Sequence, residues 1–156
     1  MQDALERLRA NRFMRSAAEV SAFEAALEVV AARRDLGLLP DLHLVLTDEC
    51  GHHEVMFGLV HLLESFEVDA QVHAFLTALP RLVQQAPTWA GVLQRRILND
   101  EAGRASCLRL FAAARLESRV AAGGVLAAIA ARDDDPLRGG ATSALRAIGS
   151  TSDQLL

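Results

Sequence analysis

The chain has 156 residues and a net charge of −4, with 51% hydrophobic and 23% charged side chains. This length is enough for one packed core, and the composition is too apolar for an intrinsically disordered chain. The longest apolar run, Val120 to Ala131, is shorter than the ~18 residues of a membrane-spanning helix, and no signal-peptide pattern opens the sequence. We therefore expect a cytoplasmic protein without a membrane partner.

The chain reads, from its start, as a succession of helices joined by short turns. Ser16-Ala-Ala-Glu19 is a capping-box pattern, and Gly37 is a suitable C-terminal cap for the helix that this pattern opens. Leu42 to Leu46 is the one segment with strand character, and no second strand is predicted to pair with it. In chain order, the expected helices cover residues 3–13, 16–34, 41–46, 48–66, 70–86, 87–99, 101–116, 118 onward and 141–148.

These helices predict an all-α fold. Successive antiparallel pairs of about 35 to 45 residues indicate helical hairpins, stacked as in a HEAT-like α-solenoid. A compact helical bundle stays open as an alternative, because the sequence has no strict repeat. We expect residues 1–149 to form a single all-helical domain and residues 150–156 to form a disordered tail.

The segment from Leu46 to Phe66, LTDECGHHEVMFGLVHLLESF, carries three of the five histidines. Thr47 and Asp48 can accept free backbone N–H groups, so they predict a helix start between residues 48 and 51. The helix has one broad apolar face, which is typical of a central helix. A narrow polar stripe lies opposite, where Gly58 suggests the close approach of a neighbouring helix or a partner. This stripe consists of Glu54, Gly58, His61 and Ser65.

The middle of the sequence is strongly acidic. Between Arg34 and Arg81 there is no basic residue, whereas the interval holds eight acids and all five histidines. Concentrated negative charge can be an ordinary solvated surface, or it can attract and select a basic protein. The candidate partner-binding residues are Asp48, Glu49, Glu54, His61, Glu64, Glu67 and Asp69.

Patterns for catalysis, metals and nucleic acids are weak. His61 and Glu64 are of metal-ligand type, but they lie about 60° apart around a helix and no H-E-x-x-H motif is present. No P-loop, G-x-S-x-G or dinucleotide motif occurs. Aromatic residues make up only 4% of the chain, and an acidic centre repels phosphate. We therefore predict no catalytic residue, no metal, no cofactor and no nucleic-acid partner.

Two segments resemble the bacterial Imm30 family of immunity proteins, which belong to polymorphic toxin systems. They are residues 46–66 and residues 75–100, FLTALPRLVQQAPTWAGVLQRRILND, and together they cover about a third of the chain. The resemblance implies a small, all-helical, non-enzymatic protein that binds and neutralises the toxin domain encoded beside it. The pieces that carry it are Thr47-Asp48, Glu54-Val55-Met56, His61 with Glu64, Pro87 with Trp89, and Arg96-Ile97-Leu98-Asn99.

Our hypothesis from the sequence is an immunity protein that occludes a cognate, basic toxin domain stoichiometrically through an acidic surface. One alternative is a HEAT-like protein-interaction scaffold without a toxin partner, which the adjacent genes would distinguish. The other is a metal-dependent helical enzyme, which metal analysis of the purified protein would distinguish.

Overall fold

The structure is a computed structural model that describes the backbone of residues 2–152 and the side chains of residues 3–149. This part of the chain contains helices and no strand, so the all-α prediction is confirmed. The helices are α1 (Gln2–Asn11), α2 (Ala17–Arg33), the 3-10 helix η1 (Leu36–Leu38), α3 (Leu39–His43), α4 (His53–Glu64), α5 (Val68–Gln85), α6 (Pro87–Asn99), α7 (Glu101–Ala113), α8 (Leu116–Ala130) and α9 (Arg138–Ser152).

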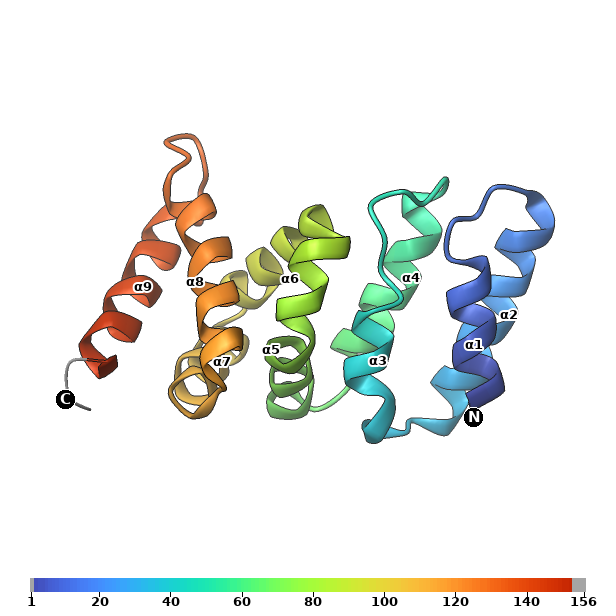
Figure 1. Cartoon of the computed structure of the whole chain (residues 1–156), viewed down its shortest axis with the longest axis horizontal. Helices are drawn as coiled ribbons and strands as arrows, with labels where there is room; N and C mark the ends of the chain where they lie inside the picture. The colour runs from blue at the N-terminus through green and yellow to red at the C-terminus, as the bar shows by residue number, and fades with distance from the viewer. Residues whose placement is uncertain (1, 153–156) are drawn as a thin grey trace.

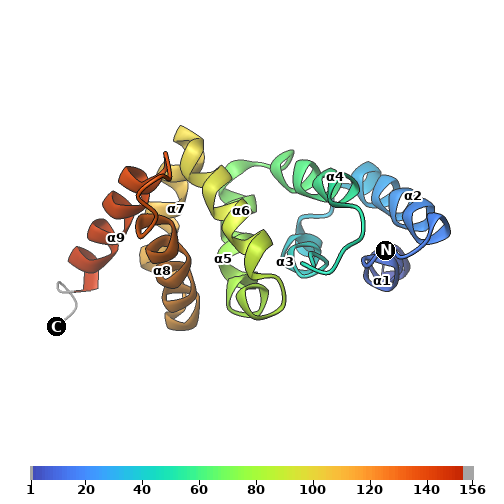
Figure 2. The same ribbon diagram turned by 90° about the horizontal axis from the view of Figure 1, so that it is seen from above.

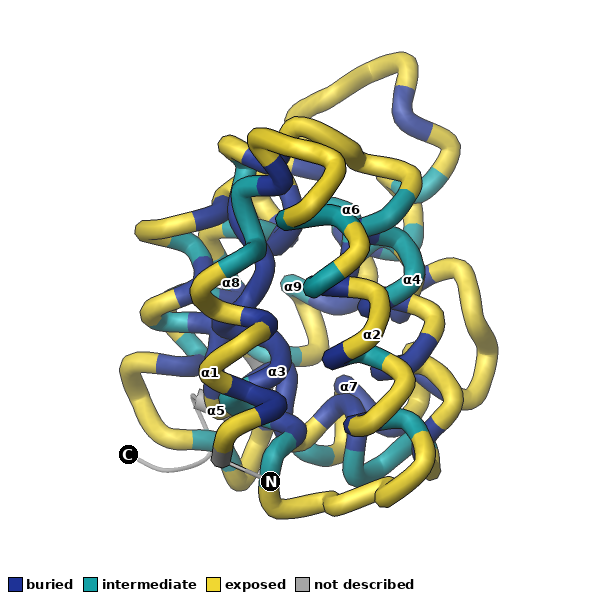
Figure 3. The backbone as a smooth tube through the Cα atoms, turned by 90° about the vertical axis from the view of Figure 1, so that its right-hand side faces the viewer, coloured by how far each residue is buried: buried dark blue, intermediate teal, exposed yellow. Residues whose placement is uncertain are grey.

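The helices stand in a row that begins with α1 and α2 and ends with α8 and α9 (Figure 1). Seen from above, α2 and α4 lie along one side of the row and α1 and α3 along the other (Figure 2). Figure 3 shows that the buried positions gather where helices face each other, with exposed positions on the outer sides. The arrangement is that of stacked hairpins.

The helix with the most neighbours is α5, which packs against α3, α4, α6, α7 and α8. The sequence pointed instead to α4 as the central helix, because of its broad apolar face. In the structure α4 does bury five side chains, but the helices whose backbones pack closest to it are α2, α3 and α5. The difference arises because α5 buries residues around much of its circumference, from Gln71 to Leu82, and Pro80 does not end it.

One predicted helix start and one predicted helix cap were wrong, and long-range contacts explain both. Helix α4 begins at His53 instead of between residues 48 and 51. At Gly51 the loop packs against the preceding α1–α2 turn, where its N–H donates to the Phe13 carbonyl at 2.9 Å. Helix α2 ends at a left-handed cap formed by Arg34 (φ 48°), not at Gly37. The Arg34 guanidinium donates to the Ser65 carbonyl at 2.6 Å, and this contact holds the cap.

The final helix is longer than the sequence indicated. The expected helix covered residues 141–148, whereas α9 runs from Arg138 to Ser152. The first part of the expected tail, residues 150–152, thus belongs to this helix. Residues 153–156 of that tail lie outside the described residues.

His43 is a fully buried histidine at the end of α3, next to the Phe75 ring of α5. Its Nδ1–H donates to the Leu39 carbonyl at 2.7 Å, whereas Nε2 has no hydrogen-bond partner in the described part of the chain. Because burial disfavours the imidazolium, the pKa of His43 falls to about 4. The side chain is therefore neutral in the folded protein at pH 7.

We predict that His43 makes folding sensitive to acid. The folded-state pKa lies below the ordinary value of 6.5, so the unfolded state binds a proton first as the pH falls. Relative to His43→Leu, the wild-type protein should lose on the order of 3 kcal/mol of stability between pH 7 and pH 4, measured by urea unfolding. The matched control is His73→Leu at an exposed position of α5. An equal pH-dependent loss for both variants would contradict the burial account.

Candidate binding surface along α4 and α6

The loop between α3 and α4 provides the cap for a helix that is distant in sequence. Helix α6 starts at Pro87, and the residue before it, Ala86, has no side chain that could accept a hydrogen bond. The Asp48 carboxylate accepts from the backbone N–H groups of Thr88 at 3.0 Å and Trp89 at 3.3 Å instead. Asp48 is thus a helix cap, as predicted, but it caps α6 and not the helix that follows it.

An aromatic cluster joins the first half of α4 to the start of α6. The Trp89 indole is buried, and its Nε1–H donates to the Thr47 carbonyl at 3.0 Å. The Phe57 ring packs edge-on against Trp89, with centroids 5.1 Å apart, and the His53 ring lies 5.7 Å from it. These contacts fix the spacing between the two helices next to the acidic loop.

A salt bridge joins the other ends of the same two helices. The Arg96 guanidinium on α6 donates through both Nε and Nη2 to the Glu64 carboxylate on α4, the latter at 2.8 Å. Glu64 follows Phe57 by seven residues, and Arg96 follows Trp89 by seven. Seven residues are about two helical turns, so the equal spacing shows that α4 and α6 run side by side in the same direction.

The predicted acids differ in how their charge is balanced. Glu64 and Asp69 are each paired with an arginine from later in the chain, since Asp69 accepts from Arg109 and from the Ser106 hydroxyl, both at 2.6 Å. These hydrogen bonds, Ser106 first, lower the pKa of Asp69. Glu67 caps α5 by accepting from the N–H groups of residues 69 and 70. With Asp48, which caps α6, four of the six predicted acids therefore have structural partners.

Glu49 and Glu54 have no arginine partner in the described part of the chain. Both side chains are exposed, and that of Glu54 has 74% of its surface accessible. Glu54 interacts with His52 at 3.0 Å. Hydrogen bonding to its own backbone N–H, and then to His52, lowers the pKa of Glu54, so this carboxylate is ionised at neutral pH. These two exposed acids, which form no ion pair with any arginine that the structure describes, thus lie around the start of α4.

The seven candidate residues are distributed between the two ends of α4, about 18 Å apart for a twelve-residue helix. Three lie at or before its first turn and three at its last residue or the start of α5; the seventh, His61, is exposed near the C-terminal end and contacts the Phe57 ring. Gly58, from the predicted polar stripe, faces α2, where an added Cβ would lie 3.3 Å from Leu27. A neighbouring helix therefore accounts for that glycine.

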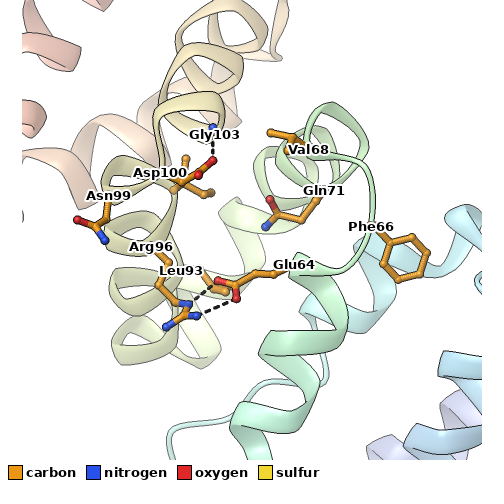
Figure 4. A pocket seen from close by; sticks show the side chains of 10 residues that line it. Glu64, Phe66, Val68, Gln71, Leu93, Arg96, Asn99, Asp100 and Gly103 are labelled. Carbon is orange, nitrogen blue, oxygen red and sulfur yellow. Dashed lines mark hydrogen bonds and ion pairs between the residues drawn. The ribbon is translucent and has the colours of Figure 1, made fainter.

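A pocket of about 460 Å³ lies at the Glu64 end of the surface (Figure 4). Its lining residues come from the α4–α5 turn, from α5, and from the end of α6 and the start of α7. Sequence reasoning did not predict this pocket or the buried Gln71 within it. The equal spacings of Phe57 to Glu64 and of Trp89 to Arg96 are compatible with two helices that lie side by side. No pattern in the sequence distinguishes Gln71 from other polar residues.

The described residues lack the side-chain clusters of other kinds of site. Within residues 2–152, no group of three or more histidine, cysteine or acidic side chains is arranged to hold a metal ion, and no helix is long and apolar enough to cross a membrane. Cys50 and Cys107 are both buried and free. Burial is the main cause that raises the pKa of each thiol.

Comparison with protein families identifies the chain. A family model described as Immunity protein 30 (Imm30) matches residues 10–107, which is more than half of the sequence. The chain belongs to the Imm30 family. It is thus an immunity protein of a toxin system, as the sequence resemblance implied. Searches of the curated proteins and of the solved structures gave no match.

The Imm30 match includes both helices of the candidate surface. It extends from the end of α1 into α7, so it contains the Asp48 cap, the aromatic cluster and the Glu64–Arg96 pair. Helices α8 and α9 lie beyond it. The surface along α4 and α6 is therefore part of the family-matched region.

We predict that removing the Asp48 carboxylate destabilises this Imm30 protein by about 1 kcal/mol, because the first N–H groups of α6 lose their acceptor. Asp48→Ala should lower the free energy of unfolding in urea and alter the fluorescence of Trp89, the only tryptophan. Glu49→Ala removes the neighbouring exposed acid and is the matched control. Equal stability of the two variants would show that Asp48 does not support α6.

Proposed function

We propose that this Imm30 protein neutralises its cognate toxin by stoichiometric binding, with the acidic surface at the start of α4 as the docking site for a basic toxin domain. A bound protein of that size would block access to the toxin's active site without any chemistry by the immunity protein. Family membership supports the toxin partner, and the charge distribution supports the location.

The observation that carries this proposal is that Glu49 and Glu54 are exposed and have no arginine partner among the described residues. Glu49 and Glu54 project from a region where the sequence has no basic residue from position 35 to position 80. Arg96 and Arg109, which reach this face from later helices, pair with Glu64 and Asp69. The negative field of Glu49 and Glu54 is therefore not cancelled by direct pairing with an arginine, although Arg12 and Arg15 belong to the α1–α2 turn that the α3–α4 loop contacts at Gly51.

This field would act mainly on the rate of association. Charges at an exposed surface steer an oppositely charged partner toward the correct encounter, and salt screens them beyond about 10 Å at 0.1 M ionic strength. The aromatic cluster beneath the acids gives the docking site a fixed backbone. A toxin would thus meet a preformed surface with little rearrangement.

We predict that Glu49→Arg and Glu54→Arg each slow association with the toxin about tenfold at low salt, and that the deficit shrinks as salt is added. Stopped-flow mixing with an inactivated form of the toxin domain encoded beside this gene measures the rate. Glu6→Arg makes the same charge change on the exposed side of α1, on the other side of the row, and is the control (Figure 2).

The association rates of the three variants decide whether the docking site is correct. Slow association confined to the two α4 variants supports the docking site. Equal effects of all three substitutions would place the interface elsewhere. Failure of the wild-type protein to bind that toxin domain would contradict the proposed function itself.

A further inference from the structure

The pocket beside the Glu64–Arg96 pair combines apolar walls with polar groups that face its interior. Leu93 and Ile97 of α6 form one wall, and Val68 of α5 lies opposite (Figure 4). Glu64 and Arg96 lie at one end, with 31% and 40% of their side-chain surfaces accessible. The site is therefore open to solvent and large enough for a long side chain from another protein.

Gln71 is the unusual residue of this pocket. It lies on the buried side of α5 and is only 7% exposed, yet its side-chain amide makes no hydrogen bond to the described residues. Figure 4 shows this amide directed into the pocket. Its oxygen and nitrogen are not sealed from solvent, because they face the open pocket. They are therefore free to bind a partner that enters the pocket.

The charges around the pocket favour a cationic ligand. Arg96 is already neutralised by the bidentate contact with Glu64, which leaves the Asp100 carboxylate as the uncompensated charge of the lining. The Oδ2 atom of Asp100 accepts from the Gly103 N–H at 2.7 Å. Carboxylate oxygens carry further lone pairs, so Glu64 and Asp100 can each accept an additional hydrogen bond.

We propose that this pocket receives an arginine side chain of the cognate toxin, with Gln71 as an acceptor for its guanidinium. The inference rests on the proposed function. It specifies which toxin side chain binds at the C-terminal end of α4. The aliphatic part of the incoming arginine would pack against Leu93 and Ile97. Its planar group has five N–H donors, so it can reach the Gln71 carbonyl and a carboxylate together, which a lysine ammonium does less well.

This arrangement places an anchor beside a steering surface. Arginine is among the residues that most often dominate binding energy, and such anchors occupy pockets from which water is excluded. The acids at the start of α4 would attract the toxin, and the pocket about two to three turns further along would hold it. Substitutions at the two ends should therefore affect different rate constants, association and dissociation.

The test uses Gln71→Met, which keeps the length of the side chain and removes the amide. Because the amide makes no hydrogen bond within the described part of the protein, the variant should unfold at the temperature of the wild type or slightly above it. Its complex with the inactivated toxin domain should nevertheless dissociate at least tenfold faster. Gln94→Met is the control, since Gln94 is fully buried on α6 and does not line the pocket. It should leave the dissociation rate unchanged.

A second variant tests the charge of the ligand. Gln71→Glu retains an acceptor of the same size and adds negative charge, so it should hold the toxin within about threefold of the wild type or more tightly. If Gln71→Glu weakens the complex as much as Gln71→Met, the ligand is not cationic and the proposal fails.

Toxin variants identify the arginine itself. Each exposed arginine of the toxin domain is replaced by methionine, and each variant is measured against the wild-type protein and Gln71→Met. One arginine should lose at least tenfold in affinity for the wild-type protein and much less for Gln71→Met. If no toxin arginine is coupled to Gln71 while Glu49→Arg still slows association, the pocket proposal is wrong and the docking surface stands. If the wild-type protein does not bind the toxin domain, both proposals fail.

Discussion

The cap that Asp48 provides for α6 is the constraint on which the candidate surface depends. Helix α6 cannot satisfy its own first N–H groups, because Pro87 and Ala86 supply no acceptor. The acceptor comes from a loop forty residues earlier, and this brings the loop, Trp89 and the start of α4 together. Once these ends are joined, α4 and α6 run side by side to the Glu64–Arg96 pair, and the pocket forms next to it.

Features that depend on neighbours in sequence were predictable. Apolar periodicity located the helices, and the capping box at the start of α2 followed from residue type, since Ser16 accepts from the Glu19 N–H. The errors arose where the partner is distant. Asp48 was assigned to the nearest helix, and Arg34 was not expected to cap α2, because its stabilising contact is with Ser65, 31 residues away.

The negative charge of the candidate site was predictable from the sequence. Which of its acids form ion pairs with arginines was not. Counting residues located the acidic interval, and the structure shows exposed acids there without an arginine partner among its described residues, Glu49 and Glu54 among them. The count could not show that Glu64 and Asp69 are paired with arginines from α6 and α7, since those contacts span 32 and 40 residues. Nor could it distinguish Gln71, whose burial depends on how α4 to α7 pack.

The fold thus presents two features on one pair of helices, an uncompensated acidic end and a polar pocket, within the part of the chain that matches the Imm30 family. The most direct test of this location is hydrogen–deuterium exchange of the protein with and without its inactivated toxin domain. The account predicts slower exchange in the complex over residues 48–71 and 93–103. Slower exchange confined to α8 and α9, with these two segments unchanged, would contradict it.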